Sequence, residues 1–319
     1  MDVLSEVLTT VRLQGALQFC PALSAPWGVR VDAQPQWAFF YSLFRGSCYL
    51  EIDGSEMPLP LVAGDLVMLA QGTGHTLRDG LQSPTIPLEE MVRNGSAGQA
   101  LKTLQRDGGG DTTTLVSGTF KFENRRTSHF LSILPRLLYI SAEDGHNVPG
   151  LKNTLQLLVD ESAPETPGTE IIRARLTDVL FVQILRAFIA QVTKLSQNCK
   201  GSGRLLRAFA DSQISQALTL IHQQPQRRWT LTELAEQLGM SRTSFAVRFS
   251  QVAGITPLDY VRKWRIHRAC DLLQQAEHSL DEIAERVGYE SGAAFSKAFK
   301  REMGITPGLY RRKHSGSTT

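Results

Sequence analysis

Two different patterns of apolar and polar positions divide the chain. From Trp37 to Thr76, short apolar runs alternate with turn residues, and another such run covers Thr114–Phe122. Runs of this kind, bounded by turn residues, are typical of β-strands. Asp53-Gly54 and Gly64-Asp65 stand where tight turns are needed. The first half of the chain therefore predicts a small antiparallel barrel or sandwich.

A helical periodicity replaces the strand pattern after Pro149. Leucines recur at positions 151, 155 and 158, and the segment Glu170–Leu195 carries a second apolar stripe. Spacings of three and four residues indicate amphipathic helices. We therefore expect two helices after the barrel. The apolar positions near helical spacing in the second helix are Ile172, Leu176, Val179, Ile184 and Phe188.

A short polar segment separates these helices from the rest of the chain. Asn198–Gly203 (NCKGSG) contains small residues and two glycines, a composition typical of a linker. We expect one domain over residues 1–197, a linker over 198–210 and a second domain over 211–314. The predicted fold class is α+β, with an antiparallel β-barrel and its helices followed by an all-α domain.

The second domain contains an internal repeat. Five residues recur 49 positions later and ten more recur at an offset of 50, with one insertion between Gly288 and Ser291. The fifteen repeated residues are Leu231, Glu233, Ala235, Glu236, Gly239, Ser241, Phe245, Phe249, Gly254, Ile255, Thr256, Pro257, Tyr260, Arg262 and Lys263. Because the identities keep their order, the same structural unit is expected twice.

Each copy predicts a helix, a glycine turn and a second helix. In the first copy, Ala235 leaves room for a neighbouring helix, Gly239 ends the first helix and Ser241 can cap the second. This order is that of a helix-turn-helix, expected over about 231–252 and again over about 280–303. A duplicated helix-turn-helix predicts nucleic-acid binding.

The second helix of each copy is expected to present one face to DNA. Phe245, Phe249 and Val252 form the predicted buried stripe of the first copy, and Phe295 and Phe299 that of the second. The candidate DNA-binding residues are Ser241, Arg242, Thr243, Ala246, Val247, Arg248, Ser250, Arg262, Ser291, Ala293, Ser296, Lys297, Lys300 and Arg301.

The two outward faces differ in chemistry. The first is nearly apolar around Val247, which suits thymine methyl groups or groove shape, whereas Lys297 can reach a guanine edge or a phosphate. Arg242, Arg248, Arg262 and Arg301 flank these faces and are expected to contact phosphates. For any single basic residue, a solvated surface position is an equally good interpretation.

One helix is expected to join the two copies. Residues 257–275 have helical character, and 18–19 residues span ~28 Å. Such a helix can place two recognition helices about one turn of DNA apart, ~34 Å. A single chain is therefore expected to read a bipartite site on double-stranded DNA.

Charge and cysteine content agree with this division. Residues 1–200 contain 17 Lys and Arg against 20 Asp and Glu, and residues 201–319 contain 17 against 11, so the net charges are −3 and +6. A basic C-terminal third suits a polyanionic partner. Scattered cysteines and the lack of a signal-peptide pattern predict a cytoplasmic location. Val179–Val192 is shorter than the ~20 residues of a membrane span, so it predicts a buried helix and no membrane partner.

Residues 211–313 resemble the DNA-binding domain of the AraC/XylS family of bacterial transcription regulators. The resemblance extends to the closing segments GITPLDYVRKWR and GYESGAAFSKAFKREMGITPGLYRR. It implies two helix-turn-helix subdomains joined by a linker helix, with recognition helices Ser241–Val252 and Ser291–Met303. It also implies contact with RNA polymerase and, usually, activation of transcription.

The N-terminal 200 residues resemble the cupin-like sensor domain of one branch of this family. GDLVMLAQGTGH (64–75) is similar to the second cupin motif, with Ala70 in place of its proline. The first cupin motif is not matched, and Tyr41 stands in the strand where the motif would place a histidine. Because a metal site needs three or four ligands and only His75 is in place, we expect no metal and no cofactor.

A cavity for a small-molecule effector is expected inside the barrel. The candidate effector contacts are Trp37, Phe39, Tyr41 and His75. We expect the three aromatic residues to point alternately into and out of the barrel, and a structural hydrogen bond is the alternative role for His75. Cys20 and Cys48 are candidates for a redox switch, although Cys48 is also expected to be buried and inert.

The duplicated reader joined to an acidic barrel favours an effector-responsive transcription activator, and not an enzyme. A metal-dependent cupin enzyme with a DNA-binding appendage and a redox-responsive regulator are the alternatives. For the stripe Val179–Val192, pairing with a second copy in a homodimer and packing on its own barrel are equally good interpretations.

Overall fold

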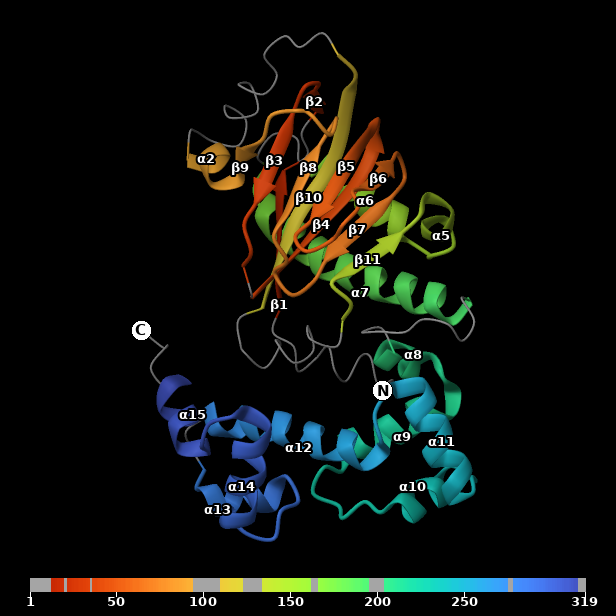
Figure 1. The fold of residues 1–319 in the computed structure, drawn as a ribbon, viewed down its shortest axis with the longest axis vertical. Coiled ribbons are helices and arrows are strands. Elements are labelled where there is room, and N and C mark those ends of the chain that lie inside the picture. Colours follow the sequence, from red (N-terminus) through yellow and green to blue (C-terminus); the bar gives the residue numbers. More distant parts are fainter. Residues whose placement is uncertain are drawn as a thin grey trace. The chain divides into compact units, whose positions relative to one another are not determined.

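The structure is a computed structural model that describes residues 13–19, 22–34, 36–93, 110–122, 134–161, 166–194, 204–274 and 278–314. The described residues up to 194 form one compact unit and those from 204 onward form another (Figure 1). Each unit is described separately below.

The strands of the N-terminal unit form two sheets. They are β1 (Leu13–Phe19), β2 (Ala22–Ser24), β3 (Gly28–Val31), β4 (Trp37–Arg45), β5 (Ser47–Ile52), β6 (Leu59–Val62), β7 (Leu66–Leu69), β8 (His75–Arg78), β9 (Ile86–Pro87), β10 (Thr112–Phe122) and β11 (Leu137–Ile140). One sheet has the order β1-β10-β4-β7-β11, with β2 also paired to β10, and the other has the order β6-β5-β8-β3-β9. Pairing is antiparallel except between β3 and β9, which confirms the predicted antiparallel barrel.

A core of buried side chains from both sheets lies between them. Phe39 and Tyr41 of β4 are buried there together with residues of β5, β7 and β8, and Trp37 packs against the same core. The expectation that these three aromatic residues alternate is wrong, because residues two apart on a strand point to the same side. Phe40 takes the opposite side and packs against Phe120 of β10, with ring centroids 5.1 Å apart.

Helices cover the outer face of the β1-β10-β4-β7-β11 sheet (Figure 1). The helices of this unit are α2 (Leu88–Arg93), α5 (Ala142–His146), α6 (Leu151–Asp160) and α7 (Thr169–Lys194). Phe181 of α7 packs against Phe120 and Phe122 with inclined rings, whose centroids are 4.8 and 5.8 Å away. The two helices expected after the barrel are therefore present, and α7 packs on its own sheet.

The buried face of α7 differs from the predicted stripe. Ile172 and Val179 are 44% and 47% exposed, whereas Leu180 and Phe181, which the stripe did not include, are fully buried. Ile184 is fully buried, as predicted. By length and composition alone α7 could cross a membrane, but a core helix of a soluble protein meets the same criterion. Its contacts with the sheet are those of such a core helix.

The C-terminal unit is all-α. Its helices are α8 (Arg204–Ala210), α9 (Ser212–Gln223), α10 (Leu231–Gln237), α11 (Arg242–Ala253), α12 (Pro257–Gln274), α13 (Leu280–Arg286), α14 (Gly292–Met303) and α15 (Pro307–His314). The pairs α10–α11 and α13–α14 form the two expected helix-turn-helix units, and α12 joins them.

Local sequence explains why the two units fold alike. Thr230 and Ser279 each begin the first helix with a reciprocal capping box, formed with Glu233 and Glu282. In the first copy, Gly239 at φ 63° then allows the chain to turn sharply after α10. The same devices recur in the same order, as the repeat predicted.

Candidate nucleic-acid interface and barrel interior

The first recognition helix, α11, begins at the predicted serine. The hydroxyl of Ser241 accepts a hydrogen bond from the backbone N–H of Ser244 at 3.1 Å, which caps the helix. Phe245 and Phe249 are fully buried, as predicted. Val252 is only half-buried, and Ala253 takes the third buried position, because 245, 249 and 253 continue one row along the helix.

The second recognition helix, α14, repeats this arrangement. The hydroxyl of Ser291 accepts from the backbone N–H of Ala294 at 3.2 Å, and Phe295 and Phe299 are fully buried. Lys300 and Arg301 lie in the last turn of α14, where cations interact favourably with the helix dipole. Both helices therefore direct their aromatic residues inward and leave an outer face free.

The structure brings most of the candidate DNA-binding residues to these outer faces. The exposed candidates are Ser241, Arg242, Thr243, Val247, Arg248, Ser291, Ala293, Lys297, Lys300 and Arg301. The half-buried candidates are Ala246, Ser250, Arg262 and Ser296. Contact of each residue with DNA stays a prediction.

Two of the candidate arginines are held by carboxylates. Arg248 donates from Nε and Nη2 to Oδ2 of Asp211, at 3.2 and 3.0 Å, while Oδ1 of Asp211 caps α9. Arg262 of α12 pairs with Asp259 at 2.9 Å and with Glu302 of α14 at 3.5 Å. These two side chains therefore connect helices within the unit, in addition to the phosphate contacts predicted for them.

Arg265 of α12 connects the segment before the first helix-turn-helix with the turn of the second, and no residue pattern predicted this role. Its guanidinium donates to the carbonyls of Pro225 and Arg227, at 2.9 and 2.7 Å, and to the carbonyl of Gly288, at 2.9 Å. Gly288 has φ 84°, and a Cβ atom there would lie 2.7 Å from the Arg265 guanidinium. The turn of the second unit thus needs glycine for its backbone angle and for this close approach.

A buried aromatic cluster holds α9 against α12. Nε2 of His222 lies 2.7 Å from the Tyr260 hydroxyl, and the imidazole stacks on Trp264 with ring centroids 3.7 Å apart. Burial, with smaller contributions from the nearby His267 and Arg268, lowers the pKa of His222 to about 3. His222 is therefore neutral at physiological pH and acts as part of the core.

The candidate sensor residues lie together in the barrel core. His75 is fully buried; its Nδ1 donates to the Thr73 carbonyl at 2.8 Å, so Nε2 accepts from the Tyr41 hydroxyl at 2.6 Å. Phe39 packs edge-on against the imidazole, with ring centroids 5.2 Å apart. Burial lowers the pKa of His75 to about 4 and raises that of Tyr41. Both groups are neutral and satisfy each other, and effector contact by these residues and Trp37 stays a prediction.

These contacts do not suit a metal ion. Both nitrogens of His75 have partners, and the described residues contain no group of three His, Cys, Asp or Glu side chains that could hold a metal. Cys48 is buried, and burial raises the pKa of its thiol to about 12, with smaller contributions from Asp65 and Asp79. Cys20, its predicted redox partner, lies outside the described residues.

Comparison with known proteins decides the family. Residues 2–190 match the family described as Cupin, and residues 234–313 match the family described as Helix-turn-helix domain. The chain is 32% identical over 312 residues to a putative AraC-like transcription regulator of Streptomyces lividans, and the alignment covers 98% of each chain. The chain belongs to the AraC-like transcription regulators.

Other relatives of this AraC-like regulator also match over almost their whole length. It is 27% identical over 314 residues to the HTH-type transcriptional regulator MtrA of Neisseria gonorrhoeae, covering 98% of this chain and 99% of MtrA. It is 28% identical over 316 residues to the RCS-specific HTH-type transcriptional activator RclR of Escherichia coli, covering 98% of each. The AraC-like regulator thus combines a cupin domain with a helix-turn-helix domain that binds DNA.

Proposed function

We propose that this regulator reads a bipartite DNA site with α11 and α14 from a single chain. The observation that carries the proposal is the link formed by α12, in which Arg265 binds carbonyls of the segment before α10 and of the turn before α14. A helix of 18 residues spans about 27 Å, close to the ~34 Å of one DNA turn. Two recognition helices held this way suit successive major grooves on one face of the duplex.

Selection from random duplex DNA followed by footprinting tests this proposal. The purified chain is expected to select two half-sites about one helical turn apart, and to protect both together. Insertion of half a turn between them should abolish joint protection, because the link then points the two helices to opposite faces of the DNA. Enrichment of a single half-site, or of no sequence, is the result that contradicts it.

We propose that the N-terminal unit binds a small-molecule effector that changes promoter occupancy. We also propose that the DNA-bound regulator activates transcription through contact with RNA polymerase. The relative RclR carries the word activator in its name, which supports this sign of regulation. Transcription with purified polymerase from a promoter carrying the selected site tests it. More transcript with the regulator supports activation, and less transcript indicates repression.

The exposed side of α7 is proposed to pair with a second copy. Ile172 and Val179 are nearly half exposed although the opposite side of the helix packs on the sheet. Sedimentation equilibrium of the Ile172→Asp and Val179→Asp variants tests this pairing. A dimer that dissociates in both variants, with an unchanged circular dichroism spectrum, supports it; an unchanged dimer or a monomeric parent chain opposes it.

We propose that the regulator has no enzymatic activity and acts in the cytoplasm, where promoter DNA is found. Relatives that match over the whole chain are named as transcription regulators. The Cys48 thiol, with a pKa near 12, stays protonated and is a poor nucleophile, which counts against redox sensing at this residue.

A further inference from the structure

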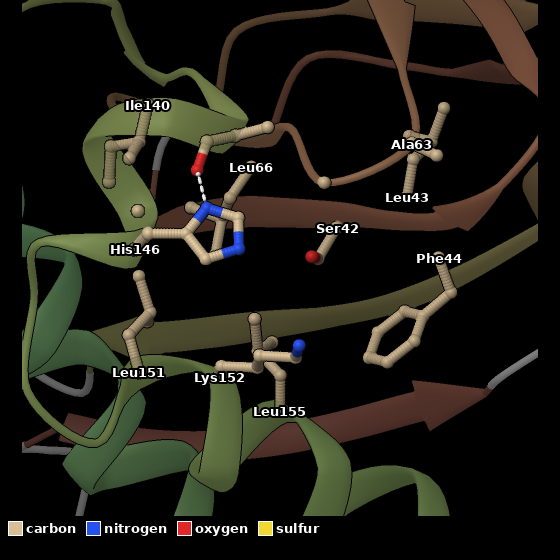
Figure 2. A pocket seen from close by; sticks show the side chains of 13 residues that line it. Ser42, Leu43, Phe44, Ala63, Leu66, Ile140, His146, Leu151, Lys152 and Leu155 are labelled. Atoms are coloured by element: carbon tan, nitrogen blue, oxygen red, sulfur yellow. Dashed lines mark hydrogen bonds between the residues drawn. The ribbon is translucent and has the colours of Figure 1, made fainter.

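A pocket lies on the outer side of the barrel, away from the core that contains Tyr41 and His75. It has a volume of about 310 Å³ and lies between the sheet and the helices α5 and α6 (Figure 2). Its lining residues come from β4, from the turn before β7, from β7 and β11, and from the two helices. The volume is at the lower end of the range of small-molecule sites.

The walls of this pocket are apolar. Leu66 and Ile140 line the sheet side, Leu151 and Leu155 line the α6 side, and Phe44 stands at the edge with 36% of its surface exposed. Leucine and isoleucine side chains favour a ligand with an apolar body, because binding buries the apolar surface of both the ligand and the pocket.

Three polar groups face the same space (Figure 2). The amine of Lys152, the hydroxyl of Ser42 and the second ring nitrogen of His146 point into the pocket. Nδ1 of His146 donates to the carbonyl of Ala142, so Nε2 remains directed at the pocket. Neither Asp nor Glu is among the described residues that line it. A cation in a lining that contains no carboxylate favours an anionic ligand group.

We propose that this pocket is the effector site and that its ligand is an apolar monocarboxylic acid. The apolar body lies between Leu66, Ile140 and Leu155, and the carboxylate accepts hydrogen bonds from Lys152 and Ser42. The inference rests on the proposed effector response and names its site and ligand class. The effector site is thereby placed in the space beneath α6, and not at Tyr41 and His75, which hydrogen-bond to each other.

The position of the pocket gives the ligand a route to α7. α6 starts at Gly150, which has φ 81° and is the point where the chain turns into the helix. α6 packs along α7, and Gln191 of α7 donates to Asp144 of α5 at 3.2 Å. A ligand between the sheet and α6 therefore shifts elements that contact α7, the helix proposed to pair in the dimer.

Titration calorimetry on the full chain tests the ligand class. The probes are octanoate, decanoate and benzoate, with octan-1-ol and octylamine as matched neutral and cationic controls. At least one carboxylate is expected to bind about tenfold or more tightly than octan-1-ol, since an interaction with a charged group of 1.4 kcal/mol or more gives that factor. Equal binding of acid and alcohol, preference for the amine, or no binding of any acid overturns the proposal.

Variants locate the site. Lys152→Met keeps the aliphatic stem and removes the charge, so it should lower the affinity for the carboxylate about tenfold and leave octan-1-ol binding unchanged. Lys152→Arg keeps the charge and should retain carboxylate binding. Ala63→Trp, at an exposed position on the pocket edge, should block both ligands with an unchanged melting temperature. Acid binding that persists in Lys152→Met and Ala63→Trp contradicts this site. Footprinting without ligand does not depend on these outcomes. If the pocket does not bind the acid, the proposed reading of DNA can therefore still be tested.

Discussion

The clearest test of the link between the two helix-turn-helix units is the replacement Arg265→Ala. It removes three hydrogen bonds from a cation to the carbonyls of Pro225, Arg227 and Gly288. A hydrogen bond to a charged group contributes about 1.5–3 kcal/mol, but the three share one partly exposed guanidinium and do not add. We expect the free energy of unfolding of this unit to fall by about 3 kcal/mol, a decrease in Tm of about 12 °C or more.

The replacement should also weaken binding to the bipartite DNA more than binding to an isolated half-site. Because Arg265 fixes one helix-turn-helix relative to the other, its loss should weaken binding to the bipartite DNA about tenfold and leave binding to an isolated half-site nearly unchanged. Calorimetric melting and fluorescence anisotropy on both DNAs measure these effects. The control is Lys263→Ala, which removes a cation from a half-buried position on the same helix and should change the free energy of unfolding by only a few tenths of a kcal/mol. A Tm loss no larger than that of the control, or equal losses on both DNAs, would refute the reasoning.

Other predictions concern the recognition faces and the buried histidines. Lys297→Ala should change base preference within one half-site by about 1–3 kcal/mol in competitive selection. Arg242→Ala should weaken binding to all DNA sequences alike and reduce the dependence of log affinity on log salt concentration by about one. Identical behaviour of the two variants would oppose these roles. Tyr41→Phe leaves Nε2 of His75 buried without a donor and should cost about 1–3 kcal/mol in urea unfolding, and an unchanged midpoint would contradict this. The pKa values of His75 and His222, about 4 and 3, lie below the unfolded value of 6.5, so the unfolded chain binds protons first as the pH falls. Stability should therefore decrease from pH 6.5 toward pH 4, by up to about 1.4 kcal/mol per pH unit for each histidine, and a flat Tm across this window would be inconsistent with neutral burial.

The C-terminal unit was predictable because its signals are local and occur twice. The capping serines at 241 and 291 and the glycines at 239 and 288 mark helix ends directly in the sequence. The aromatic residues at helical spacing then place the buried side of each recognition helix. The third buried position of α11 was wrong, since a valine and an alanine are adjacent and either can complete the row. Residues 204–210, expected within the linker, form α8 of this unit.

The features that escaped prediction depend on contacts between distant segments. β1 pairs with β10, and β11 pairs with β7, across long stretches of chain without a connecting hairpin. The face that α7 buries is chosen by the aromatic partners of Phe181 on the sheet, which the spacing within the helix does not reveal. Arg265 bonds carbonyls 40, 38 and 23 residues away, and no residue pattern marks such a contact.

Footprinting of the intact chain on a selected bipartite site tests the central claim most directly. We expect joint protection of two major-groove segments about one turn apart on one face of the DNA, and loss of this joint protection when half a turn is inserted between them. Protection of one segment that is insensitive to the insertion, or uniform salt-sensitive coating of the duplex, would contradict it.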